Sequence, residues 1–185
     1  MLSDTEKADL LKRARHAAAR ALGLPEARRV LPPAEGRLAE AGAAFVTWKK
    51  DGRLRGCIGT VEPWRPLADD VEENAVTALL HDPRFAPAQP RDLPRLTLEI
   101  SVMTPLEEVT EPLAQIEIGV HGVVARKGQR SGLLLPQVAP EWGWDAPALL
   151  SQVCLKAGLP DDAWRSGSPP ATIYRFSADV FGESA

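Results

Sequence analysis

The segment KDGRLRGCIGT, from Lys50 to Thr60, combines residue types that could support thiol chemistry. Cys57 lies between Gly56 and Gly59, two residues after Arg55. A neighbouring cation favours the thiolate, which is the nucleophilic form of a cysteine. Glycines within a strand let a ligand or another backbone come close. The pattern therefore predicts that Cys57 is a nucleophile or thiol donor and that Arg55 binds an anion or stabilises the thiolate.

A packing role for Cys57 is the alternative, because free cysteine is among the most buried residue types and packs as a small apolar side chain. Under the chemical interpretation, Gly56, Ile58 and Gly59 are the candidates for ligand binding around the thiol. Under the packing interpretation, they are ordinary residues of a strand.

Arg84 is a further candidate for ligand binding. It belongs to the loop HDPRF, residues 81–85, which follows a predicted helix and could bring the guanidinium to a cleft. Alternatively, the loop only ends the helix and places Phe85 in the core. The acidic residues at the start of that helix, Asp69, Asp70, Glu72 and Glu73, are interpreted as its solvated first turns.

The register of the hairpin follows from its turn. The dipeptide Asp-Gly at 51–52, between two alternating segments, predicts a two-residue connection. Counting outward pairs Trp48 with Arg55 and Val46 with Cys57. Arg55 and Cys57 then share one face of the strand, and the guanidinium can stack on the indole of Trp48.

Metal and nucleotide sites lack support in the sequence. His16, His81 and His121 are scattered, and neither CxxC nor HExxH occurs, although one histidine with carboxylates remains an alternative. The chain also lacks a Walker A loop, a GxGxxG motif and a GxSxG elbow. We therefore expect neither a metal nor another cofactor.

The composition is that of a globular protein. Of 185 residues, 44% are hydrophobic and 25% are charged, while the net charge of -3 argues against nucleic acid as a general partner. The N-terminus does not resemble a signal peptide, and no apolar run reaches the length of a membrane span. We therefore expect a cytoplasmic protein, away from membranes, in which Cys57 and Cys154 are free thiols.

The elements that must position these residues follow from hydrophobic periodicity. A helix is predicted from about residue 3 to 22, then a connector at 25–42, a hairpin from residue 43, a helix over 67–80 and a strand over 96–103. The second half repeats this order, with a hairpin from residue 123, a helix from Asp145 and a strand over 172–180.

The repeat predicts an α+β fold with a mainly antiparallel sheet, built from two ββαβ units after an N-terminal helix. The two lobes would span about residues 43–104 and 120–180, with Gly56 equivalent to Gly132 and Cys57 equivalent to Leu133. Because leucine fills the equivalent place, this architecture does not itself require a cysteine. The alternative to duplication is chance similarity between two short hairpins.

Five segments in this order, LRGCIGT, HDPRF, EISVM, GLLLPQVAP and KAGLP, resemble the AMMECR family, over residues 5–181. The chain departs from the usual family pattern at Met103 and Trp48. The resemblance implies a single two-lobed α+β domain with RGCIG at or near a cleft. It also implies two partners, a Memo-like protein similar to extradiol dioxygenases and a radical-SAM protein, but it does not supply a reaction.

Three functions are therefore considered. The first is an enzyme or enzyme component that uses Cys57 and Arg55. The second is a non-catalytic adaptor, for which the strand at 53–59 is a docking surface. The third, a role in transcription, repair or translation, is weakened by the acidic pI of about 5.7.

Overall fold

The computed structural model describes residues 1–183, apart from the side chain of Glu26. The chain is α+β, as predicted, and divides into two compact units. Unit 1 comprises residues 1–103 with the described residues from 179 onward, and unit 2 comprises residues 104–178. Within the described residues, no helix is both long and apolar enough to cross a membrane.

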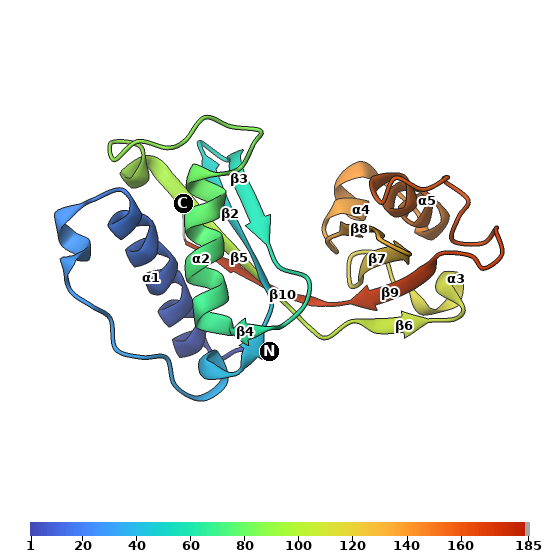
Figure 1. Ribbon diagram of the computed structural model, residues 1–185, viewed down its shortest axis with the longest axis horizontal. Helices are drawn as coiled ribbons and strands as arrows, with labels where there is room; N and C mark the ends of the chain where they lie inside the picture. Colours follow the sequence, from blue (N-terminus) through green and yellow to red (C-terminus); the bar gives the residue numbers. More distant parts are fainter. Residues whose placement is uncertain (184–185) are drawn as a thin grey trace. The chain divides into compact units, whose positions relative to one another are not determined.

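Unit 1 is a four-stranded sheet covered by two helices (Figure 1). The strand order is β10-β5-β2-β3, and β2 pairs antiparallel with both β3 and β5. Helix α2 packs on β2 and β3, and α1 packs on α2. The bounds are α1 Asp4–Ala21, β2 Ala44–Lys50, β3 Arg53–Gly59, α2 Leu67–Leu80, β5 Leu96–Met103 and β10 Ala178–Gly182.

Short elements complete unit 1. The connector after α1 contains two 3-10 turns, η1 Pro25–Arg28 and η2 Gly36–Ala39, and a third, η3 Leu93–Arg95, precedes β5. Strand β1, Ala41–Gly42, pairs with β4, Arg65–Pro66, next to the start of α2.

Local signals set both ends of α1. The Ser3 hydroxyl accepts from the backbone N–H of Glu6, whose carboxylate accepts in return from the Ser3 N–H. After the helix, Gly23 has a φ of 72°, a left-handed conformation that glycine adopts without strain. The predicted helix is therefore confirmed to within a residue at each end.

Unit 2 has a second four-stranded sheet, with the order β6-β9-β7-β8. Its strands are β6 Glu107–Val109, β7 Gly122–Lys127, β8 Arg130–Leu134 and β9 Thr172–Phe176, and its helices are α3 Pro112–Gln115, α4 Val138–Trp142 and α5 Ala146–Lys156. Helix α5, capped by Asp145, packs on β7 and β8. Strand β6 and helices α3 and α4 were not predicted.

The single strand predicted over 172–180 is wrong. It divides at Ser177 into β9, which joins the sheet of unit 2, and β10, which lies beside β5 in unit 1. At the break, the Thr104 N–H donates to the Ser177 carbonyl at 2.9 Å, and the Ser177 N–H donates to the Thr104 hydroxyl at 2.9 Å. The alternating sequence does not reveal the division, because both halves have the same period.

The two sheets share a strand order. Strand β5 lies beside β2 and β2 beside β3, as β9 lies beside β7 and β7 beside β8. A Cβ on Gly56 would lie 2.0 Å from the Ala78 carbonyl oxygen of α2, and one on Gly132 would lie 2.5 Å from the Ala157 nitrogen after α5. Each hairpin therefore has a glycine where its helix approaches, which is what a duplication predicts. The lobe boundaries and the superposition of the two units remain predictions.

The predicted register of the first hairpin is wrong beyond its turn. Lys50 pairs with Arg53, but a β-bulge between Trp48 and Lys49 places Gly56 opposite Trp48 and Cys57 opposite Thr47. The physical reason is burial. The predicted register would have put Arg55 on the buried face of β2 that carries Trp48, and an unpaired charge there is very unfavourable. The bulge leaves Arg55 of β3 without a partner on β2, and the face that carries Trp48 therefore stays apolar.

The predicted stacking of Arg55 on Trp48 is wrong for the same reason. Trp48 is fully buried, and its indole N–H donates to the Ala75 carbonyl of α2 at 2.9 Å. The guanidinium over its ring is that of Arg15 from α1, 5.2 Å from the ring centroid.

Candidate functional site

Cys57 lies half-buried on β3, opposite Thr47 of β2. Its backbone N–H points away from β2, so the two residues form a non-hydrogen-bonded pair, in which side chains are closest. The Thr47 hydroxyl donates to the Cys57 sulfur at 3.2 Å. The bulge therefore gives the thiol a hydroxyl neighbour, instead of the Val46 side chain that the sequence analysis predicted.

Two side chains from the loop after α2 hold the backbone of Cys57. The N–H of Cys57 donates to the Asp82 carboxylate at 2.9 Å, and Arg84 donates to the Cys57 carbonyl at 3.2 Å. Arg84 also donates to Asp82 through Nε at 3.0 Å and Nη2 at 2.7 Å. Because β3 is the edge strand, this ion pair occupies the place of a neighbouring strand at that residue.

Asp82 and Arg84 stabilise each other's charged form. The Asp82 side chain is 1% exposed, and its hydrogen bond from Arg84 holds its pKa well below the usual range. Burial opposes that effect, and the backbone N–H groups of Cys57 and Arg84 reinforce it. The pKa of Arg84 is raised by its hydrogen bond to Asp82, against the effect of burial, and the Cys57 thiol contributes in the same direction. The guanidinium that contacts Cys57, at its backbone carbonyl, is therefore that of Arg84.

Phe85 is flanked by two guanidinium groups. The Arg55 carbon Cζ lies 5.7 Å from the ring centroid, and that of Arg84 lies 5.5 Å from it. Arg55 also donates to the Ala86 carbonyl at 2.6 Å. Phe85 is half-buried and lies outside the apolar core of unit 1, so its alternative role as a core residue is wrong. The loop instead gathers Arg55 and Arg84 near Cys57.

The other predicted ligand contacts have packing neighbours. Gly56 faces α2, and a Cβ on Gly59 would lie 2.3 Å from the ring of Phe45. Ile58 packs against the core of unit 1. Close packing thus explains both glycines, and a direct role for these three residues in ligand binding stays a prediction.

Sequence comparison places the chain in a family. A sequence model described as AMMECR1 matches residues 11–181. The chain belongs to the AMMECR1 family. The relatives of this AMMECR1 protein include "Protein MK0488" of Methanopyrus kandleri, 50% identical over 160 residues that cover 82% of this chain and 76% of that protein. They also include "Protein TK0174" of Thermococcus kodakarensis, 44% identical over 168 residues that cover 84% of this chain and 81% of that protein.

A solved structure has the same fold. The crystal structure of the uncharacterized protein PH0010 from Pyrococcus horikoshii aligns with this AMMECR1 protein at a TM-score of 0.88 and 35% sequence identity. The alignment covers 99% of this chain and 94% of that one. The α+β arrangement is therefore shared with that protein.

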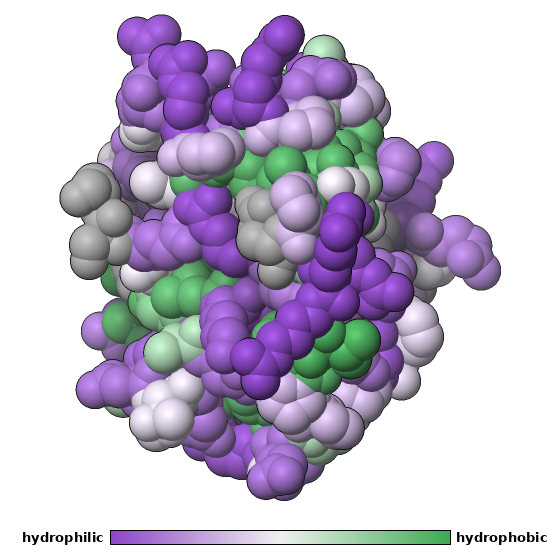
Figure 2. Space-filling view, turned by 90° about the vertical axis from the view of Figure 1, so that its left-hand side faces the viewer, coloured by the Kyte–Doolittle hydropathy of each residue, from purple (hydrophilic) through white to green (hydrophobic). Residues whose placement is uncertain are grey.

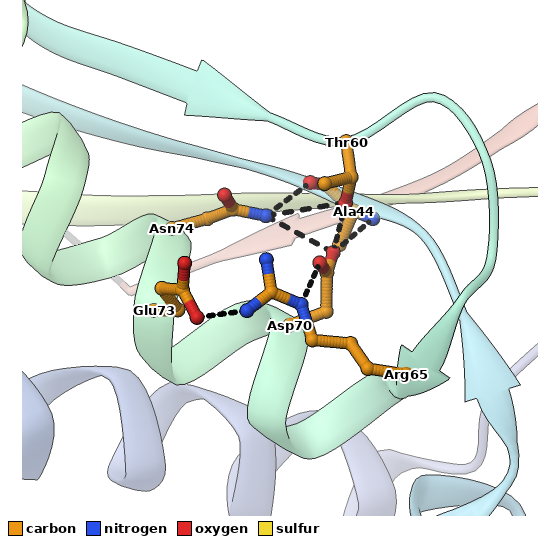
Figure 3. Close-up of polar contacts among 6 residues, drawn as sticks. All are labelled: Ala44, Thr60, Arg65, Asp70, Glu73 and Asn74. Atoms are coloured by element: carbon orange, nitrogen blue, oxygen red, sulfur yellow. Dashed lines mark hydrogen bonds and ion pairs between the residues drawn. The ribbon is translucent and has the colours of Figure 1, made fainter.

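A second polar cluster lies where β3 ends, around Asp70 of α2 (Figure 3). Asp70 is fully buried, so its interpretation as a solvated residue is wrong. Its carboxylate accepts from the Ala44 N–H, from Asn74 and from Arg65 Nε, each at 3.0 Å, and from the Thr60 hydroxyl. Because these contacts join α2 to β2 and to the end of β3, the cluster positions the RGCIG strand from its far end.

Cys154 provides an internal contrast to Cys57. It is fully buried in the apolar core of unit 2, where burial raises the pKa of its thiol. Such a cysteine is expected to be inert in the folded protein. The two cysteines therefore occupy different environments: Cys57 has a side-chain hydroxyl donor and a guanidinium at its backbone carbonyl, whereas Cys154 lies in an apolar core.

Asp82, Thr47 and Asp70 were not singled out as site residues from the sequence. Asp82 stands in the HDPRF segment, which suggested that the loop matters, but its contact with Cys57 requires the loop to fold back on β3. Thr47 was recognised as the neighbour of the Cys57 sulfur only from the strand register in the structure. That RGCIG lines a cleft stays a prediction.

Proposed function

We propose that this protein is an enzyme, or an enzyme component, in which Cys57 is the nucleophile or thiol donor. The observation that carries the proposal is the hydrogen bond from the Thr47 hydroxyl to the Cys57 sulfur, in a residue whose backbone carbonyl accepts from the guanidinium of Arg84. A hydroxyl donor and a cation both favour a thiolate. A cysteine that only fills space needs neither, as Cys154 illustrates.

The proposed chemistry is attack on an electrophilic carbon. Cys57 loses its proton to solvent, its sulfur forms a bond to the carbon, and the displaced electron pair moves to the heteroatom of the electrophile. Arg55 and Arg84 suit an anionic substrate, because guanidinium groups bind carboxylates and phosphates with paired hydrogen bonds. The Arg84 side chain is 54% exposed and can be approached from solvent.

The test is the rate of alkylation by iodoacetamide at a fixed neutral pH, with Cys154→Ser isolating one thiol. We expect Cys57 to react in the folded protein, and Thr47→Val to slow the reaction roughly threefold to tenfold through loss of one hydrogen bond. Thr97→Val, on the neighbouring strand β5, is the matched control and should have no effect. Arg84→Met should slow the reaction more than Arg55→Met, because Arg84 is the guanidinium that contacts Cys57.

Two results would contradict the proposal. One is that Cys57 reacts only at the rate of unfolding, measured as a function of urea concentration. The other is that Thr47→Val and Thr97→Val react alike. Either outcome would return Cys57 to a packing role.

The second candidate is an adaptor, favoured by the position of β3 at the edge of its sheet, where Leu54 is 44% exposed. Edge strands and exposed apolar side chains are docking features. We propose as partners a Memo-like protein and a radical-SAM protein, on the basis of family membership alone. Leu54→Asp should abolish binding of a purified partner if the protein is an adaptor, whereas Cys57→Ser should leave that binding unchanged.

The remaining expectations also rest on the sequence. We expect the protein to act in the cytoplasm and not to bind nucleic acid, so the role in transcription, repair or translation is the weakest of the three. Binding of a nucleic acid at physiological salt concentration would reverse that order.

A further inference from the structure

We propose a second binding site in unit 1, separate from Cys57, for a small molecule with an apolar body and an anionic group. The site is a cavity of about 690 Å³ between α1, the connector after it and the start of α2. That volume lies within the range of about 300–1,000 Å³ typical of ligand pockets. Nothing in the proposed thiol chemistry uses this cavity.

The connector over this cavity is held in place by side chains of α1. Arg13 donates through Nη2 to the Pro32 carbonyl at 2.8 Å, and His16 donates through Nε2 to the Arg29 carbonyl at 2.6 Å. Arg13 and His16 lie three residues apart, on one face of the helix. The connector is also anchored by Ala27, which is buried. The cavity is therefore a formed feature of the fold.

The wall that the connector supplies is apolar. It includes Leu24, Ala27, Leu31 and Ala34, and Val30 lies at the rim with 81% of its surface exposed. Figure 2 views this side of the molecule and shows apolar patches between hydrophilic side chains. An exposed apolar rim is unfavourable in water and becomes favourable when an apolar ligand covers it.

The charges around the cavity favour an anion. Arg13 pairs with Asp9 at 2.9 Å and with Glu72 at 3.3 Å, so its charge is balanced. Arg20 and Arg28 also line the cavity, and within the described part of the chain neither guanidinium group has a hydrogen-bond or ion-pair partner.

Among the side chains that the structure describes, the cavity lining therefore includes two guanidinium groups without a partner and one such carboxylate, that of Asp69. Guanidinium groups bind carboxylate, phosphate or sulfonate oxygens through paired hydrogen bonds. Arg20 and Arg28 therefore suit an anionic ligand, and the Asp69 carboxylate could accept a hydrogen bond from a donor on that ligand.

The experiment compares two fluorescent probes with the same aromatic body, the anion anilinonaphthalene sulfonate and the neutral N-phenylnaphthylamine. We expect one saturable site for the anion on the folded protein. The double variant Arg20→Gln, Arg28→Gln should weaken binding of the anion about tenfold or more while leaving the neutral probe unchanged. Arg53→Gln, on the hairpin of β2 and β3, removes one positive charge from a residue outside the cavity lining and should have no effect.

A variant that fills the cavity tests whether the probes bind there. Ala39 is exposed at the cavity, so Ala39→Phe should be tolerated and should reduce binding of both probes. The proposal is overturned if this variant binds both probes as the wild type does, or if Arg53→Gln weakens the anion as much as the double variant. Cys57→Ser should not alter binding of either probe, so this test is independent of the thiol proposal.

Discussion

Replacing Asp82 by asparagine tests whether the ion pair that holds Cys57 stabilises unit 1. One carboxylate oxygen of Asp82 accepts from the Cys57 N–H at 2.9 Å and from Arg84 Nη2 at 2.7 Å. The other accepts from the backbone N–H of Arg84 at 3.1 Å and from its Nε at 3.0 Å. Asparagine has one carbonyl oxygen, so it can accept only one of these two pairs of hydrogen bonds. Its NH₂ group would lie opposite the two N–H donors of the other pair and cannot accept from them.

The expected loss of folding free energy follows from the number of hydrogen bonds that asparagine cannot accept. Two hydrogen bonds to a charged acceptor are lost, each worth about 1.5–3 kcal/mol when shielded from water. Solvent screens the half-exposed Arg84 and reduces these values. We therefore expect Asp82→Asn to lower the free energy of unfolding by about 2–4 kcal/mol. Asp92→Asn is the control, with a smaller expected cost, because the solvated Asp92 carboxylate accepts one backbone hydrogen bond, from Gln89, and its ion pair with Lys50 is long, at 3.9 Å.

The assay is urea unfolding followed by the fluorescence of the buried Trp48, with Trp64 and the tryptophans of unit 2 replaced by phenylalanine. The pH dependence gives a second readout. Because the folded pKa of Asp82 lies below its unfolded value of about 3.9, the carboxylate stabilises the fold above about pH 4, and that stabilisation is lost as pH falls through the folded pKa.

The stability difference between wild type and Asp82→Asn should therefore be constant from about pH 5 to 8 and shrink in more acidic solution. A cost of about 1 kcal/mol or less at neutral pH would refute the reasoning. So would a difference that does not change as Asp82 is protonated.

Two further substitutions test how the RGCIG strand is positioned. Gly56→Ala should destabilise unit 1 by about 3 kcal/mol or more in urea unfolding, because its Cβ would lie 2.0 Å from the Ala78 carbonyl oxygen. In the control Gly52→Ala, the new Cβ meets no neighbour within 4 Å, and the expected cost is about 1 kcal/mol from the positive φ of that residue. A smaller loss for Gly56 than for Gly52 would be inconsistent with close packing of β3 on α2. Asp70→Ala should cost about 3–5 kcal/mol in the same assay, because it removes the acceptor of the Ala44 N–H and of Asn74 and leaves Arg65 paired only with the exposed Glu73. A loss similar to that of the exposed Asp69→Ala would contradict a structural role for the cluster.

The sequence by itself determined the elements whose signals are local. The capping box of Ser3 and Glu6 and the glycine at Gly23 fixed both ends of α1. Strict alternation predicted β5 at residues 96–103, where the structure has it. These features depend on a few consecutive residues, so they can be read without knowing what packs against them.

The identity of the candidate site was partly determined by the sequence. Cys57, Arg55 and Arg84 were selected from residue type and spacing, and the HDPRF loop does bring both arginines to the same ring, that of Phe85. Which guanidinium contacts Cys57 did not follow from spacing. Arg55 is closer in sequence, yet Arg84 makes the contact, because the loop folds back along the edge of β3.

Tertiary structure alone decided the features that depend on a burial cost. The β-bulge at Trp48 and Lys49 exists because the face of β2 under α2 must stay apolar, and no residue near the turn encodes that requirement. The division of the last strand depends on which sheet offers a free edge, and the burial of Asp70 depends on partners up to 26 residues away. Each choice is settled by the free energy of packing distant segments together, which a local sequence pattern does not contain.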